Sequence, residues 1–360
     1  MNSATVPDLP ADRRRAGGPA RLLYRVLGGQ PQAIGVGVAV VGLFVISGLH
    51  NPYFWELNNI KVLATNMSFI AIAGVGTAIL IISGNVDLSI GSILGLSAVL
   101  SAMFAKVMPV PLAIVCGPAI GAAIGAINGV VVWNVSAAPI IVTLGSLTLL
   151  RGVVYVVSSG EAITNVPGSF TSVANASPAG VPLSVWVAVG VALLGFLFMT
   201  FTQTGRHLYA VGGNREASRA AGIRTRRIVI GAFIVSGLLA GVVGMLQASL
   251  YTAPDETFGT GFELQVITAV IVGGVSFAGG EGGIVRAMLG VALLEIVSGA
   301  VVAFNIDPSY ANIFTGAILI FAVSLDQMVH KHRARFQKAM AARERARVVA
   351  EQRGVSEDGP

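Results

Sequence analysis

Long apolar stretches separated by short polar breaks run along almost the whole chain. A helix needs roughly 20 apolar residues to span the hydrocarbon core of a bilayer, with a range of about 17–25. Ten stretches fit this description, at about 33–49, 58–82, 88–107, 111–133, 139–158, 181–201, 228–250, 262–279, 282–303 and 309–329. The pattern predicts an all-α polytopic membrane protein with ten transmembrane helices.

The breaks between these stretches carry turn residues, such as Asn51-Pro52, Gly84-Asn85 and Pro167-Gly168. On this basis we divide the chain into a disordered basic tail at 1–31, a transmembrane domain at 32–330 and a basic tail at 331–360. A long polar connection at 202–227 interrupts the transmembrane domain.

Charge predicts how the helices are oriented. The N-terminal tail, the 202–227 connection and the C-terminal tail together hold 19 of the 23 Lys and Arg residues. Cytoplasmic segments of membrane proteins are enriched in Lys and Arg, so all three belong on the cytoplasmic side. This requires an even number of spans between them, which ten helices with both termini inside provide. Contact of the C-terminal tail with anionic lipid and simple solvation of that tail both remain open.

Composition agrees with a membrane protein, because 54% of the residues are hydrophobic and 11% are charged, against about 25% charged in soluble domains. The net charge of +6 does not indicate nucleic acid binding, since the charges lie at the ends and in one internal stretch. No G-x-x-x-x-G-K-[ST] motif, metal-ligand spacing or hydrolase motif is present. We therefore expect no enzyme chemistry, metal or cofactor in this chain.

The 202–227 connection contains a candidate docking helix. Asn214 can cap a helix with Glu216 in its first turn, and Gly222 can end that helix in a left-handed conformation. Ala217, Ala220 and Ala221 would give it a small apolar side, suited to a groove on another protein. The alternative is an ordinary basic loop lying on lipid headgroups.

A second candidate feature is the helix break at Gly84-Asn85, followed by Asp87 and Ser89 as possible caps. Broken helices in transporters place free backbone groups beside a cavity, although a cap on a short cytoplasmic turn would look the same. Ionisable residues inside predicted spans are candidates for function or for structural pairing, namely Arg151, Glu263, Arg286 and Glu295. Gly121, Gly125 and Gly129 predict close helix packing.

Four further stretches have distinctive motifs: 82–92 (I-S-G-N-V-D-L-S-I-G-S), 139–145 (P-I-I-V-T-L-G), Arg151-Gly152 and 273–283 (G-G-V-S-F-A-G-G-E-G-G). Glu216-Ala217-Ser218 with Gly222 is similar to the E-A-A-x-x-x-G loop of bacterial ABC importer permeases. Together with that loop, the four stretches resemble the ribose/xylose/galactose-type permease family of bacterial sugar importers. The resemblance covers about 50–330, and Asn85 departs from the glycine expected there.

The resemblance implies a permease subunit of an ATP-driven importer in the bacterial inner membrane, without nucleotide binding of its own. Its partners would be a cytoplasmic ABC ATPase that binds ATP, an extracytoplasmic sugar-binding protein, and a second permease copy or a paralogue. The coupling residues would be Asn214, Arg215, Glu216, Ala217, Ser218, Arg219 and Gly222. The substrate pathway would include Ser83, Asn85, Asp87, Ser89, Thr143, Arg151, Gly273 and Gly274.

Two other classes remain open from the residues. A secondary transporter would need a coupling-ion carboxylate within the membrane, for which Glu295 is the candidate. A channel would need a selectivity filter, and no such signature is evident. Among sugars, pentoses, hexoses, deoxysugars, inositol and furanosyl signal molecules would all fit this scaffold.

Overall fold

The computed structural model describes residues 31–135, 138–324 and 327–328. The predicted tail at 331–360 lies outside the described residues, as does the tail at 1–31 except for its last residue, Pro31, where α2 begins. The described part of the chain consists of helices and connecting loops and contains no strand. The predicted all-α class is confirmed.

Within the described residues, eight helices are long and apolar enough to cross a membrane. They are α2 (Pro31–His50), α3 (Leu57–Ile82), α4 (Ile90–Val107), α5 (Val110–Val135), α6 (Pro139–Ser158), α8 (Leu183–Phe201), α11 (Thr225–Tyr251) and α13 (Ile284–Ala303). Two shorter apolar helices, α12 (Phe262–Val272) and Tyr310–Ser324, fall at the eighth and tenth predicted stretches. Every predicted apolar stretch therefore contains a helix.

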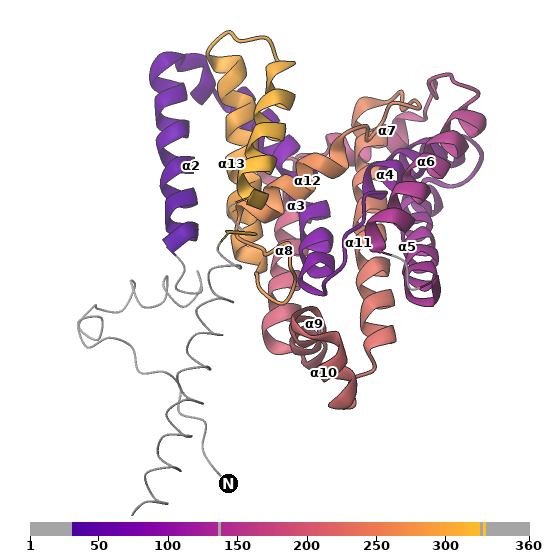
Figure 1. The fold of residues 1–360 in the computed structure, drawn as a ribbon. Coiled ribbons are helices and arrows are strands. Elements are labelled where there is room, and N and C mark those ends of the chain that lie inside the picture. The colour runs from indigo at the N-terminus through magenta and orange to yellow at the C-terminus, as the bar shows by residue number, and fades with distance from the viewer. Residues whose placement is uncertain (1–30, 136–137, 325–326, 329–360) are drawn as a thin grey trace, which may run out of the picture.

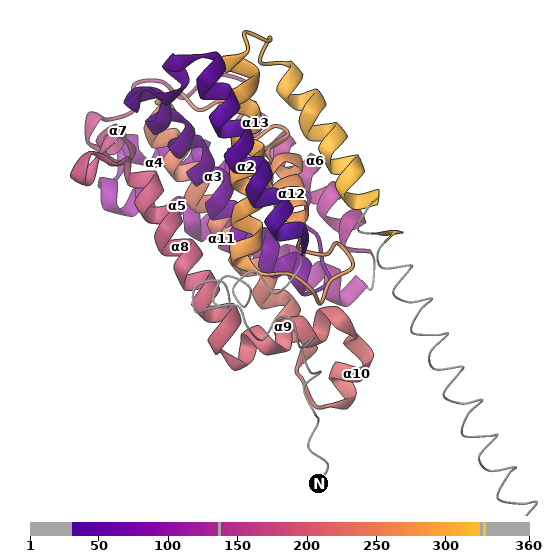
Figure 2. The ribbon, with the colours of Figure 1, turned by 90° about the vertical axis from the view of Figure 1, so that its left-hand side faces the viewer.

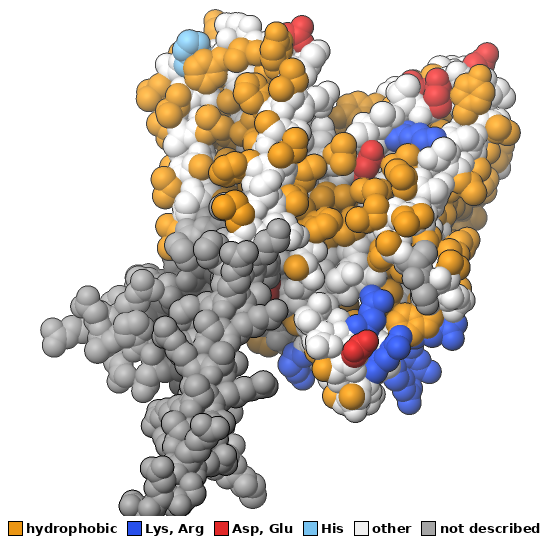
Figure 3. All heavy atoms as spheres, viewed as in Figure 1, with side chains coloured by type: hydrophobic (Ala, Val, Ile, Leu, Met, Phe, Trp, Pro, Cys, Tyr) orange, Lys and Arg blue, Asp and Glu red, His pale blue; other side chains and the backbone are white. Residues whose placement is uncertain are grey.

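Short helices occupy the connections. Near one end of the bundle are η2 (Pro52–Trp55), α7 (Gly168–Asn175) and η3 (Pro178–Gly180), and near the other are α9 (Gln203–Gly213) and α10 (Arg215–Ala220). Both ribbon views place α9 and α10 together at the lower end of the molecule (Figures 1 and 2). Basic side chains gather at this end (Figure 3). This clustering agrees with the charge pattern, and the orientation of the termini stays a prediction.

The eighth predicted span was too long. It was expected to run from 262 to 279, but α12 ends at Val272. The following segment, 273–283, forms a loop in which Gly274, Gly279, Gly280 and Gly282 have positive φ angles of 100°, 84°, 74° and 148°. Glycine adopts such angles at little cost and weakens a helix, so the apolar character of this stretch concealed a break.

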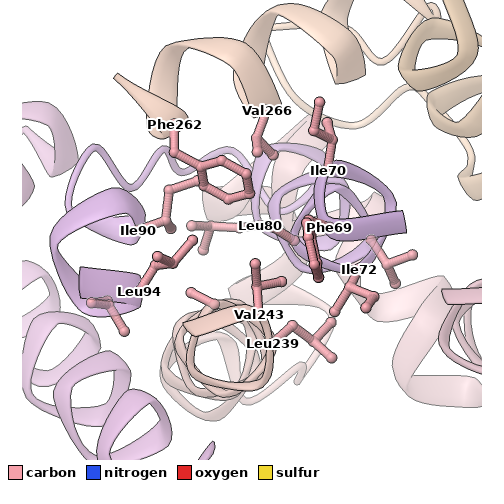
Figure 4. Packing of buried hydrophobic residues seen from close by; sticks show 14 of the residues in the cluster. Phe69, Ile70, Ile72, Leu80, Ile90, Leu94, Leu239, Val243, Phe262 and Val266 are labelled. Carbon is pink, nitrogen blue, oxygen red and sulfur yellow. The ribbon is translucent and has the colours of Figure 1, made fainter. Parts of the chain in front are cut away.

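Helix α3 lies at the centre of the core. Its side chains Phe69, Ile72 and Leu80 are fully or almost fully buried, and they lie among residues of α4, α11 and α12 (Figure 4). α11 packs closely against α5, where a Cβ atom added to Gly121 would lie 2.1 Å from the carbonyl oxygen of Gly237. The close packing predicted for the G-x-x-x-G stretch of α5 is thus confirmed.

Candidate coupling and translocation site

The predicted break after α3 is present. Gly84 has a φ of 78°, and the backbone nitrogens of Gly84 and Asn85 donate to the carbonyls of Ile81 and Leu80 at 2.8 and 3.2 Å. This pair of hydrogen bonds is the Schellman ending of a helix, and it allows the chain to turn sharply out of α3.

A buried polar cluster fills the break. Ser89 donates to Asp87 Oδ1 from its backbone nitrogen at 2.8 Å and from its hydroxyl at 2.5 Å. Asn128 on α5 donates to the Ser89 hydroxyl at 2.9 Å. Asp87 Oδ2 is buried and has no hydrogen-bond partner among the described residues. Asp87 therefore caps the turn that leads into α4 through Oδ1, while Oδ2 accepts no hydrogen bond from the described residues.

The break lies inside the bundle. Ser92, in the first turn of α4, donates a hydrogen bond to the carbonyl of Leu147, near the middle of α6, at 3.0 Å. α4 therefore starts near the mid-height of its neighbour, as the half-helices of transporters do. Thr143 on α6 is buried, but its hydroxyl donates to Pro139 in its own helix at 2.9 Å.

The loop after α12 repeats this geometry. The backbone nitrogens of Gly274 and Val275 donate to Ile271 and Val270 at 2.9 and 3.2 Å, as Gly84 and Asn85 do after α3. Gly280 then donates its backbone nitrogen to the carbonyl of Ile82, the last residue of α3, at 2.9 Å. The break predicted at Gly84-Asn85 and the break after α12, which the sequence analysis missed, are therefore joined directly.

A third segment, the end of α9, joins the same contact. A Cβ atom added to Gly212 would lie 1.8 Å from the Ile82 carbonyl oxygen and 2.7 Å from the Gly280 nitrogen. One added to Gly279 would lie 2.8 Å from the Cα atom of Gly84. We call this meeting of Ile82–Gly84, Gly212 and Gly279–Gly280 the glycine junction. Sequence reasoning missed α9, although the Gly212-Gly213 pair was a possible signal of close backbone approach.

The helix predicted after Asn214 is present as α10, and its docking role stays a prediction. The Asn214 side chain accepts a hydrogen bond from the Ala217 nitrogen at 2.9 Å, and Glu216 lies in the first turn. Gly222 has a φ of 82° and donates to Arg219 at 2.9 Å. Ser218 is buried, whereas the predicted small apolar side at 217, 220 and 221 is exposed. α10 therefore presents a free surface at the basic end of the molecule.

Polar contacts tie α10 to the first break. Arg215 donates from Nη2 to Asn85 Oδ1 at 3.2 Å, and the Asn85 amide donates to the Ser83 carbonyl and hydroxyl at 3.1 and 3.0 Å. The guanidinium groups of Arg215 and Arg219 lie 5.9 and 4.9 Å from the ring centre of Trp133 on α5. Burial, and then the like charge of Arg219, lower the pKa of Arg215. Asn85, the departure from the expected glycine, is thus a contact with the docking helix.

The ionisable residues within the helices fall in different places. Arg151 on α6 donates from Nη1 to the carbonyls of Glu256 and Phe258 at 3.0 and 2.6 Å. Glu295 on α13 is buried, and its carboxylate interacts with the side chain of Asn66 on α3. Arg286 lies in the first turn of α13, close to the break that begins at Gly273. The structure therefore brings Ser83, Asn85, Asp87, Ser89, Gly273 and Gly274 to the two joined breaks, whereas Arg151 contacts the segment between α11 and α12.

Comparison with known proteins gives one family. A family model described as "Branched-chain amino acid transport system / permease component" matches residues 59–323. The ribose import permease protein RbsC of Escherichia coli (strain K12) is 33% identical over 297 residues, covering 80% of this chain and 92% of the relative. The D-allose transport system permease protein AlsC of the same strain is 32% identical over 289 residues, covering 80% and 89%.

A third relative is the L-arabinose ABC transporter permease protein AraH of Azospirillum brasilense. It is 33% identical over 310 residues, which cover 84% of this chain and 91% of the relative. No solved structure matches the chain.

Proposed function

The chain belongs to this family of transport permeases, as a multi-pass protein of the bacterial inner membrane, and from that premise we propose that it forms the membrane pathway of an ATP-driven monosaccharide importer. The relatives named for ribose, allose and arabinose support a monosaccharide as the substrate class. ATP would be bound and hydrolysed by a separate cytoplasmic ABC ATPase subunit.

The observation that carries this proposal is the glycine junction. α10 offers an exposed surface for the ATPase, and α9 connects it to the end of α3 and to the loop that follows α12. Backbones in direct contact leave no flexible side chains to absorb a movement, because close-packed interiors transmit strain. A displacement of α10 by the ATPase would therefore reach both breaks.

The Arg215–Asn85 hydrogen bond gives a second connection. When the ATPase moves α10, Arg215 would pull on Asn85 while Gly212 pushes on Ile82. Both contacts lie next to the Asp87–Ser89 turn, where α4 begins. We propose that this turn opens and closes the cytoplasmic end of the pathway as ATP is bound and hydrolysed.

The remaining partners follow from the same class of importer. An extracytoplasmic sugar-binding protein would deliver the substrate to the end that carries α7. A second copy of this chain or a paralogue would complete the translocation path. Membrane lipid would surround the exposed apolar faces, among them Ile141, Leu144 and Val156 of α6.

Co-purification tests the proposed ATPase contact. The cognate ABC ATPase should co-purify with the wild-type chain and not with Glu216→Lys, which places a cation at the start of α10, where the helix dipole disfavours it. Gly222→Pro should also lose the ATPase, since proline cannot adopt a φ of 82°. Both variants should insert normally, because neither position lies in a spanning helix. Retention of the ATPase by both variants would show that α10 is not the contact.

A further inference from the structure

The segment between α11 and α12 runs along α4. A Cβ atom added to Gly95 would lie 2.5 Å from the Phe258 carbonyl oxygen, and one added to Gly91 would lie 2.3 Å from that of Gly259. The segment can lie this close to α4 only because Gly91 and Gly95 have no side chains. The segment reaches the first turn of α4 before α12 begins at Phe262, so α12 starts beside that turn.

The path of this segment brings two oppositely charged residues, Glu263 and Arg151, to the same side of α4. Glu263 lies in the first turn of α12, with its Oε2 atom over Gly91, where an added Cβ would lie within 2.1 Å of it. Arg151 reaches the same segment from α6 through the carbonyls of Glu256 and Phe258. The space-filling view shows a hollow between two groups of helices, with basic and acidic side chains close together on one wall (Figure 3).

Neither charge is satisfied by the other. Their charges interact electrostatically, yet no hydrogen bond joins them in the part of the chain that the structure describes. Glu263 Oε2 is buried without a hydrogen-bond partner among those residues. Arg151 makes both of its hydrogen bonds there through Nη1 alone. A buried carboxylate oxygen without a partner is costly, so this arrangement favours a ligand that donates a hydrogen bond.

We propose that Glu263 and Arg151 form a hydroxyl-binding subsite for the transported monosaccharide. One sugar hydroxyl would donate to Glu263 Oε2, and a neighbouring sugar oxygen would accept from the free nitrogens of Arg151. The aromatic pair Tyr251–Phe258, with ring centres 6.1 Å apart, supplies an apolar surface beside it. The inference rests on the proposed function and adds the residues that recognise the substrate within the pathway.

Saturation-transfer NMR on the full-length chain in lipid nanodiscs tests the subsite, with D-ribose, D-allose and L-arabinose as probes. We expect saturable binding of at least one sugar. Glu263→Gln should raise its half-saturation concentration about tenfold, the effect of one hydrogen bond to a charged group. The control Glu161→Gln removes the same charge from an exposed loop and should leave binding unchanged. The unfolding temperature of Glu263→Gln is measured beside its binding, so that a loss of binding is distinguished from a loss of folding.

Two results would overturn the subsite: no saturable binding of any of the three sugars, or equal binding by the wild type and Glu263→Gln. Either result leaves the importer proposal standing if the reconstituted complex still imports a sugar. Conversely, a wild-type chain that binds sugar through Glu263 but supports no ATP-driven import would refute the importer and keep the subsite.

Discussion

Substitution of Gly212 by alanine tests the glycine junction. The new Cβ atom would lie 1.8 Å from the carbonyl oxygen of Ile82, whereas ordinary contact begins at 3.4 Å. The end of α9 and the end of α3 must therefore separate by roughly 1.5 Å. The Gly280–Ile82 hydrogen bond of 2.9 Å lies in the same place and cannot survive such a shift.

The magnitude follows from two contributions. Overpacking of a tight contact costs about 1–3 kcal/mol, and loss of the hydrogen bond costs about 1 kcal/mol. Together they weaken the junction by about 2–4 kcal/mol, which is enough to disconnect α9 from α3 for most of the time. Helix propensity acts in the opposite direction, because alanine stabilises a helix such as α9 by up to about 1 kcal/mol relative to glycine.

Gly213→Ala is the matched control. It makes the same chemical change one residue later, where an added Cβ atom meets nothing within 4 Å. Hydrogen exchange of the backbone amides in 82–85 and 279–282 should accelerate in Gly212→Ala and stay at the wild-type rate in Gly213→Ala. In the reconstituted complex, Gly212→Ala should hydrolyse ATP with fewer sugars imported per ATP. Unchanged exchange and unchanged import per ATP in Gly212→Ala would refute the junction as the mechanical connection.

Three further changes test other contacts. Gly222→Ala should destabilise the end of α10 by about 1–2 kcal/mol because of its φ of 82°, seen as faster proteolysis of the 215–225 segment; an unchanged cleavage rate would contradict the left-handed cap. Asn85→Gly removes the acceptor for Arg215 and should reduce coupled import severalfold with normal ATPase binding, whereas wild-type import would make this hydrogen bond dispensable. In a Cys116→Ala background, a cysteine at Ser169, which is exposed on α7, should react with an impermeant maleimide from outside the cell; reaction from the cytoplasmic side alone would reverse the topology.

The fold was predictable where hydrophobic length decides it. A run of apolar residues long enough to span a bilayer has few alternatives to a helix, because backbone groups must be paired in lipid. The same reasoning failed at 273–283, where glycines keep the stretch apolar while breaking the helix. α7 and α9 were missed because their residues are polar and lie in connections, where hydrophobic length carries no information.

The candidate site was predictable only in pieces. Asn214 and Gly222 form their capping hydrogen bonds with residues three positions away, so both helix caps could be inferred from local spacing. The contact between Gly212, Ile82 and Gly280 joins residues far apart in sequence, and it depends on the absence of side chains. Glu263 was recognised as an ionisable residue, but its approach to Arg151 depends on the path of 252–261 along the glycines of α4.

ATP-driven sugar uptake by proteoliposomes is the most direct test of the central claim. The vesicles would contain this chain with its ATPase, and the binding protein loaded with radiolabelled sugar would be outside. We predict uptake that requires ATP in the compartment facing α10, persists when ionophores collapse all ion gradients, and is lost in Glu216→Lys. Uptake that proceeds without the ATPase and stops when the gradients collapse would contradict the account and indicate a secondary transporter.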